Sequence, residues 1–187
     1  MPVLRRFALC LCALPVLAQQ PAGMAPEWDV RVILNELAAQ ADRLQPVFNQ
    51  IDAKAWVAKG ASETYSVQLE SCKAQARALA GGARALAQKP DVLPAALELY
   101  FRMQGLDHMI GSLMEGIRRY QNPAVAELLA GVAAEGGANR ERFLRFLLDL
   151  AAEREQQFSV MDREAQRCRG MLARQPVEPP KTTGGKK

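Results

Sequence analysis

The residue best placed to do chemistry is Cys168, which stands between Arg167 and Arg169 in the segment EAQRCRG. A cysteine thiol becomes a nucleophile when it is exposed and when nearby positive charge favours the thiolate. In a helix, however, successive residues point about 100° apart, so the two arginines need not face the sulfur. Cys168 also falls on an apolar stripe, and this position predicts a buried thiol rather than a reactive one.

A disulfide is a second chemistry open to Cys168, because Cys72 is the other cysteine of the chain after Ala18. Bonded cysteines need Cα atoms within about 7 Å of each other. Along an unbroken helix over residues 123–174, Cys168 would lie about 68 Å from the start, whereas Cys72 would lie about 15–17 Å along its own helix. A bond therefore requires the chain to reverse at Gly136-Gly137. An internal disulfide, two separate buried thiols and a disulfide between chains all remain open.

Metal and haem sites have few ligands to draw on. His108 is the single histidine, so the two Glu-x-x-His motifs of a di-iron bundle cannot be built. No C-x-x-C-H segment is present for covalent haem,. The methionines near His108 share its helix, whereas a second haem ligand would have to come from another helix; they are Met103, Met109 and Met114. We therefore expect no metal and no cofactor.

Catalytic motifs are missing as well. The chain carries no nucleophile elbow, phosphate-binding loop or zinc-protease motif,. Its carboxylates mostly stand three or four residues from an arginine, as in Glu141 with Arg145 and Glu164 with Arg167. At that helical spacing they form surface ion pairs rather than acid–base pairs. The sequence predicts a protein that is not an enzyme.

The elements that must position these residues are helices. Apolar residues recur at spacings of three and four, and no run alternates with period two,. The segments expected to be helical are 27–59, 62–89, 91–119 and 123–174. Ser62, Asp91 and Asn122 are suited to cap the later three. Short connections between such segments predict an all-α antiparallel bundle of four to five long helices with heptad-like seams.

Two of these segments contain residues that interrupt a helix. Pro46 lies within the first segment, where we expect a kink; a break into two helices is the alternative. Gly60 is suited to end that segment in the left-handed conformation. Gly136-Gly137 lies within the last segment and favours a break there, because paired glycines inside a helix are costly.

The last segment is longer than the bundle that it joins. As one helix it would span about 78 Å, whereas residues 27–59 would span about 50 Å. The apolar stripe of this segment, its seam, continues through Phe158, Met161 and Leu172 into the part of the helix that is longer than the bundle. Arg154 is the one charged member of the seam; it can reach solvent, pair with a carboxylate of a neighbouring helix or contact a partner. We predict an interface at these four residues, with a second copy of the chain or with an envelope protein.

The segment 1–18 has the layout of a secretory signal peptide, with Arg5-Arg6, an apolar run ending at Leu17, and Ala18 before the expected cleavage,. The run of about 11 residues is too short to span a bilayer. We expect export to the periplasm or medium of a bacterial-type cell, with no membrane span after cleavage. Residues 19–26 and 175–187 are expected to be disordered, and 27–174 to form one domain.

The charge distribution argues against nucleic-acid binding. The net charge of +4 is what remains when Glu178 is set against five basic residues outside 27–174: Arg5 and Arg6 in the predicted signal peptide and three lysines near the end of the chain. Residues 27–174 carry equal numbers of basic and acidic side chains, so the clustered positive charge that nucleic acid requires is absent.

These patterns together predict an exported, non-catalytic helical bundle that acts as an interaction or structural element of the cell envelope. The alternative is a bundle that binds a small ligand, a metal or haem in a polar groove near His108. Gln104, Ser112 and Glu115 stand at helical spacing from that histidine and would line such a groove.

Overall fold

The computed structural model of the chain describes residues 27–173. The predicted signal peptide, residues 19–26 and the tail 175–187 lie outside the described residues. Within them the chain forms six α-helices and no strand, which confirms the all-α prediction. The helices are α1 (Glu27–Phe48), α2 (Ala53–Val57), α3 (Thr64–Gln88), α4 (Leu93–Tyr120), α5 (Pro123–Ala134) and α6 (Gly137–Ala173).

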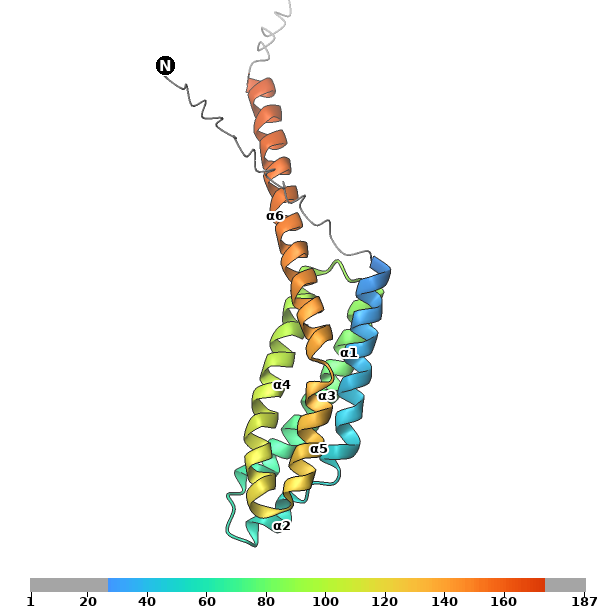
Figure 1. The fold of residues 1–187 in the computed structure, drawn as a ribbon. Coiled ribbons are helices and arrows are strands. Elements are labelled where there is room, and N and C mark those ends of the chain that lie inside the picture. The colour runs from blue at the N-terminus through green and yellow to red at the C-terminus, as the bar shows by residue number, and fades with distance from the viewer. Residues whose placement is uncertain (1–26, 174–187) are drawn as a thin grey trace, which may run out of the picture.

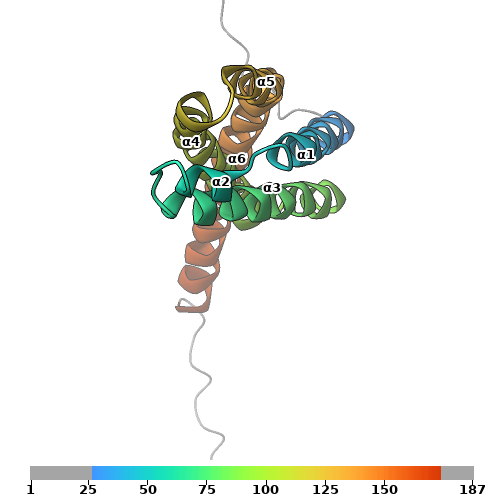
Figure 2. The same cartoon turned by 90° about the horizontal axis from the view of Figure 1, so that it is seen from below.

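The long helices form an antiparallel bundle. Consecutive long helices α1, α3 and α4 run in alternating directions, and α5 with the first part of α6 completes the bundle (Figure 1). The short α2 closes the end opposite to the start of α1 (Figure 2). Buried apolar residues of all six helices form one core cluster, since each amphipathic helix turns its apolar stripe inward,.

The segment 27–59, expected to be one helix kinked at Pro46, is divided into two helices, which was the alternative prediction. Helix α1 ends at Phe48, two residues after that proline, and the Asp52 side chain starts α2 by accepting the amide N–H of Ala55 at 3.0 Å. This division lets Trp56 turn under the bundle, where it is 1% exposed. Its indole Nε1 donates to Gln121 Oε1 at 3.2 Å.

The predictions at the helix ends are confirmed in part. Asn122 Oδ1 accepts the amide N–H of Ala124 at 2.9 Å and so caps α5. Gly60 adopts a φ of 89°, the left-handed conformation expected there,. Ser62 is one exception, because Glu63 precedes α3 as its cap residue without a side-chain capping bond, although Ser62 Oγ accepts the Thr64 amide at 3.3 Å. Asp91 is another, because Val92 precedes α4 as its cap residue and the Asp91 carboxylate is turned toward α6.

Candidate interaction surface on α6

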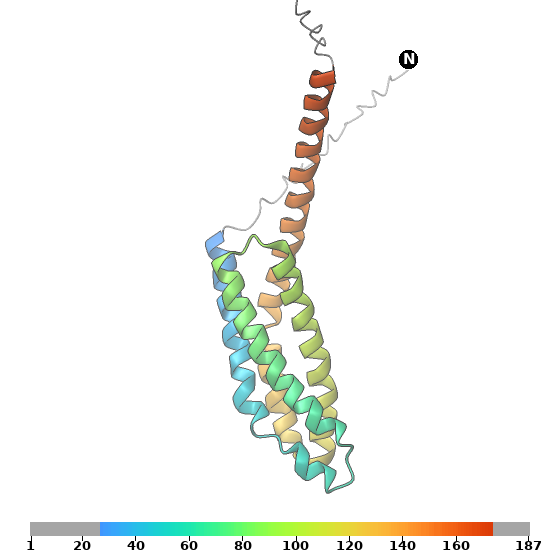
Figure 3. The same cartoon turned by 180° about the vertical axis from the view of Figure 1, so that it is seen from behind.

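Helix α6 begins inside the bundle and continues beyond its end. Its buried side chains are Phe143, Phe146, Leu147 and Leu150. Every residue from 155 to 173 is exposed, and this stretch, here called distal α6, is about 28 Å long. Figures 1 and 3 show it standing clear of the other helices. The excess length expected from the sequence is therefore a projecting helix.

Distal α6 carries the three apolar side chains singled out in the sequence. Phe158 is 73% exposed, Met161 67% and Leu172 66%. Helices in proteins draw most of their stability from packing an apolar face, and large apolar side chains gain free energy when they leave water. Distal α6 thus leaves in water apolar side chains of the kind that other helices of the chain bury in the core.

Arg154 marks the point at which α6 leaves the bundle. Its guanidinium Nη2 donates to the Asp91 carbonyl oxygen at 2.9 Å and lies 3.3 Å from the Asp91 carboxylate. Its Nη1 donates to Gln157 Oε1 at 3.0 Å. Of the three roles considered for Arg154, pairing with a carboxylate is the one the structure contains, although Asp91 belongs to the α3–α4 connection rather than to a helix.

The two cysteines are free thiols in very different surroundings. Cys72 is 0% exposed in the core, and burial raises the pKa of its thiol to about 11. Cys168 is exposed on distal α6, so the prediction that its seam position buries it is wrong. The apolar stripe extends past the end of the bundle, where none of the described helices covers it.

An internal disulfide between the two cysteines would require the chain to reverse at Gly136-Gly137. The chain does not reverse there, because α6 continues in the direction of α5 (Figure 1).

The break at Gly136-Gly137 is present as a turn between α5 and α6. Gln40 of α1, the one polar residue among the buried side chains of the described range, fills it. The Gln40 Nε2 amide donates to the carbonyl oxygens of Val132 at 3.3 Å and Ala133 at 3.1 Å. Those carbonyls lie at the end of α5, where the helix no longer supplies donors for them. Gln40 therefore satisfies the backbone that the break exposes.

A second polar pair lies beside this break. Arg140 donates to the Ala133 carbonyl oxygen at 3.0 Å and forms an ion pair with Asp107 of α4. Burial raises the pKa of the Asp107 carboxyl, and the charge of Arg140 opposes that rise. The adjoining cavity is about 20 Å³, room for about one water molecule. This cluster has the features of a structural junction between α1, α4 and the two parts of the last segment.

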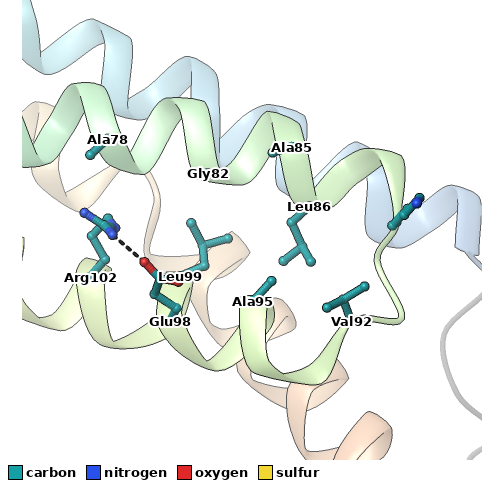
Figure 4. Close-up of a pocket in the computed structure, with 10 residues that line it drawn as sticks. Ala78, Gly82, Ala85, Leu86, Val92, Ala95, Glu98, Leu99 and Arg102 are labelled. Atoms are coloured by element: carbon teal, nitrogen blue, oxygen red, sulfur yellow. Dashed lines mark hydrogen bonds and ion pairs between the residues drawn. The ribbon is translucent and has the colours of Figure 1, made fainter.

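Two hollows in the surface of the bundle are open grooves. One of about 390 Å³ lies between α3 and the start of α4, where Leu86, Val92 and Leu99 face it and the Glu98–Arg102 ion pair lies at its edge (Figure 4). Another, of about 730 Å³, lies along α2 and α3. The first groove is lined mainly by alanine and other apolar side chains, whereas the second mixes apolar side chains with serines and charged residues, among them the Glu70–Lys73 ion pair. Both grooves offer open contact surface.

The predicted polar surroundings of His108 lie on the outside of α4. His108, Gln104, Ser112 and Glu115 are all exposed, and none of them lines the grooves described above. Met103 is buried in the core, and Met109 and Met114 pack against it. Within residues 27–173, no three His, Cys, Asp or Glu side chains are grouped so that they could hold a metal ion.

Two of the ion pairs expected from helical spacing can be compared with the structure. Glu141 and Arg145 form one at 3.5 Å. The expected pair between Glu164 and Arg167 is absent, and in the described part of the chain neither side chain makes an ion pair. Both charges are thus without an ion-pair partner within residues 27–173.

No helix in the described range is both long enough and apolar enough to cross a lipid bilayer. Comparison with known proteins found no matching family model, no similar curated protein and no similar solved structure.

Proposed function

We propose that the protein is an exported, non-catalytic interaction protein of a bacterial-type cell envelope, in which the bundle holds out distal α6 as a docking helix. The observation that carries this proposal is the complete exposure of residues 155–173 with Phe158, Met161 and Leu172 among them. Export is supported by the signal-like layout of the segment 1–18,.

The bundle is built to hold this helix firmly at its base. Phe143 and Leu150 are 0% exposed in the core. Arg142 Nη2 bonds to Asp29 of α1 at 2.9 Å, and Arg154 bonds to Asp91 where α6 emerges. Contacts on both sides of the buried turns fix the direction of α6. A helix held in this way loses little further entropy on docking, which favours binding.

The apolar residues of distal α6 also distinguish it from a solvated helix end. Burying a Phe, Met or Leu side chain contributes about 1.5–3 kcal/mol relative to leaving it in water. Three such side chains, together with Met171 at 57% exposed, supply a driving force that the bundle itself does not use. Large exposed apolar patches of this kind mark interaction sites.

The experiment is site-specific photo-crosslinking in the native envelope. Phe158→benzoylphenylalanine places the probe on distal α6. Phe101→benzoylphenylalanine is the matched control, because Phe101 is 67% exposed on α4. We expect a discrete adduct from position 158 that Met161→Asp abolishes, with no such adduct from position 101.

The proposal is overturned if position 158 gives only unlinked protein, or if Met161→Asp leaves its adduct unchanged. Cell fractionation tests export: the protein should be recovered from the periplasm or medium, and retention in the cytoplasm contradicts the exported part of the proposal.

The alternative function, a ligand site near His108, has less support because that side chain lies exposed on α4.

A further inference from the structure

We infer that the partner of distal α6 is distal α6 of a second copy, packed antiparallel about a two-fold axis between Ala165 and Cys168. This inference rests on the proposed function, because it names the partner of the same surface. Four observations carry it: the spacing of the apolar residues, the face of the helix on which they lie, the arrangement of charges and the exposure of the whole segment.

The apolar and small residues of distal α6 follow a heptad. Phe158, Met161, Ala165, Cys168 and Leu172 are separated by steps of three and four. All five are exposed. Residues with this spacing share one face of a helix and pack into the corresponding face of another as a coiled coil. The occupant that best suits the seam is therefore a helix carrying the same pattern.

The seam lies on the same face of α6 that packs against the bundle. Phe158 follows Leu147, and Met161 follows Leu150, by about three full helical turns. Leu147 and Leu150 are buried in the core. The bundle therefore occupies the seam side of α6 directly before distal α6 begins. In the end-on view of Figure 2, α6 starts beside α5, passes behind α3 and emerges on the far side of α3.

This placement decides the direction of the second helix. A parallel partner would continue toward its own N-terminus along the seam side of α6, into the space that the bundle fills. An antiparallel partner ends there instead, since its C-terminal turn points at the bundle and its own bundle stands beyond Ala173. The antiparallel arrangement is the one that leaves room for both molecules.

The charges beside the seam select one antiparallel register. When Met161 faces the partner's Leu172 and Ala165 faces the partner's Cys168, Asp162 comes opposite the partner's Arg169, and symmetry repeats that pair. Neither Asp162 nor Arg169 makes an ion pair within the described part of the chain. Opposite charges at these flanking positions favour pairing, and like charges oppose it.

The neighbouring register is disfavoured by the same reasoning. Sliding the helices by one heptad places Asp162 opposite the partner's Asp162 and Glu164 opposite the partner's Glu164. Such like-charge contacts cost free energy and exclude the register. In this register the facing seam residues run from Met161 to Leu172, about three helical turns on each helix, and Phe158 lies at the edge of the interface. Because the interface is short, we expect reversible association rather than a permanent dimer.

A charge exchange tests the arrangement in the mature full chain. Asp162→Arg and Arg169→Asp each place like charges across both symmetry-related pairs. We expect each single change to weaken the dimer about tenfold in sedimentation equilibrium, and the double variant to recover most of that loss. In a parallel pair, Arg169→Asp would instead face the partner's Glu164, and the exchange would not recover.

Cysteine pairs test the register independently. In a Cys72→Ala, Cys168→Ala background, a mixture of the Met161→Cys and Leu172→Cys proteins should be linked by a short bismaleimide. Met161→Cys alone should not be, because its two copies would lie about 16 Å apart along the axis. Linkage of Met161→Cys to itself overturns the antiparallel arrangement, as does a double charge variant that stays as weak as the single ones.

Failure of this inference and failure of the proposed function can be separated. A wild-type protein that is monomeric at all concentrations, with a Phe158→benzoylphenylalanine adduct to a different protein, overturns the self-association and leaves the docking helix in place. Absence of any adduct from distal α6 overturns both. A dimer whose adduct is a second copy, with recovery in the double charge variant, supports both.

Discussion

Gly136 and Gln40 are fitted to each other at the point where the last segment of the chain breaks. A Cβ atom at Gly136 would overlap the Gln40 side chain at Oε1, Cδ and Nε2. The Gln40 amide occupies this position because it donates to the carbonyl oxygens of Val132 and Ala133 at the end of α5. The absence of a side chain at residue 136 and the amide at residue 40 are thus two parts of one junction.

Gly136→Ala should destabilise the bundle by displacing that amide. The Gln40 side chain can swing away from an added methyl group, but the Val132 carbonyl then loses the Gln40 amide as its donor in a partly buried place, and Ala133 keeps only Arg140. We expect a loss of about 1–3 kcal/mol in the free energy of unfolding, the range for a buried polar group left without a partner. Urea unfolding followed by circular dichroism measures it.

The neighbouring glycine provides the control for this experiment. A Cβ at Gly137 meets nothing within 4 Å, so Gly137→Ala should be neutral or stabilise α6 by about 1 kcal/mol through helix propensity. Equal losses in the two alanine variants would contradict the role given to Gln40 and would point to a general need for flexibility at the turn.

Two phenylalanines of α6 should respond in opposite ways to removal of their rings. Phe143 is 0% exposed and Phe158 is 73% exposed. Phe143→Ala should cost about 3–5 kcal/mol of stability, whereas Phe158→Ala at a concentration where the protein is monomeric should change stability by less than about 0.5 kcal/mol. Thermal or urea unfolding of both variants checks this. A large loss in Phe158→Ala would mean that distal α6 folds back onto the bundle.

The helices were predictable because their signals are local. The three-four spacing of apolar residues, and the Asn122-Pro123 start that the structure confirms, depend only on neighbours in sequence. The break at Gly136-Gly137 was also predictable from helix propensity. Its form was not, because Gln40 lies far away in sequence, in α1, from the two α5 carbonyls that it satisfies.

Burial along a seam was harder to predict than the seam itself. A heptad tells which face of a helix is apolar but not where the covering helices end. Cys168 was therefore expected to be buried and is exposed. Phe158, whose exposure followed from comparing helix lengths, is exposed as the length argument required. The burial of Trp56 could not be predicted from the spacing of apolar residues, because its indole is held by a hydrogen bond to Gln121, which follows α4.

The two cysteines should react with thiol reagents at very different rates. Cys168 is exposed on a projecting helix, whereas Cys72 is buried. A maleimide added to the native, reduced protein should label one thiol quickly, and peptide mapping by mass spectrometry should place it at Cys168. Cys72 should be labelled only after denaturant is added. In a parallel sample that has not been reduced, two thiols that label in denaturant only after reduction would instead reveal a disulfide.

Cys72 also predicts a loss of stability in alkaline solution. Burial raises the pKa of its thiol to about 11, whereas a cysteine in an unfolded chain ionises near pH 8.5. As pH rises through that lower value, the unfolded state loses its proton while the folded state keeps it. The equilibrium therefore shifts toward unfolding until the folded pKa is passed, with a total loss on the order of 3 kcal/mol.

Urea unfolding of wild type and Cys72→Ala at several pH values isolates this contribution. Lysines and tyrosines titrate in the same range, but they do so in both proteins. The stability of the wild type should fall relative to that of the variant between about pH 8.5 and about pH 11, and the difference should stay constant below that window. A difference that is independent of pH across the window would show that the Cys72 thiol reaches solvent in the folded protein.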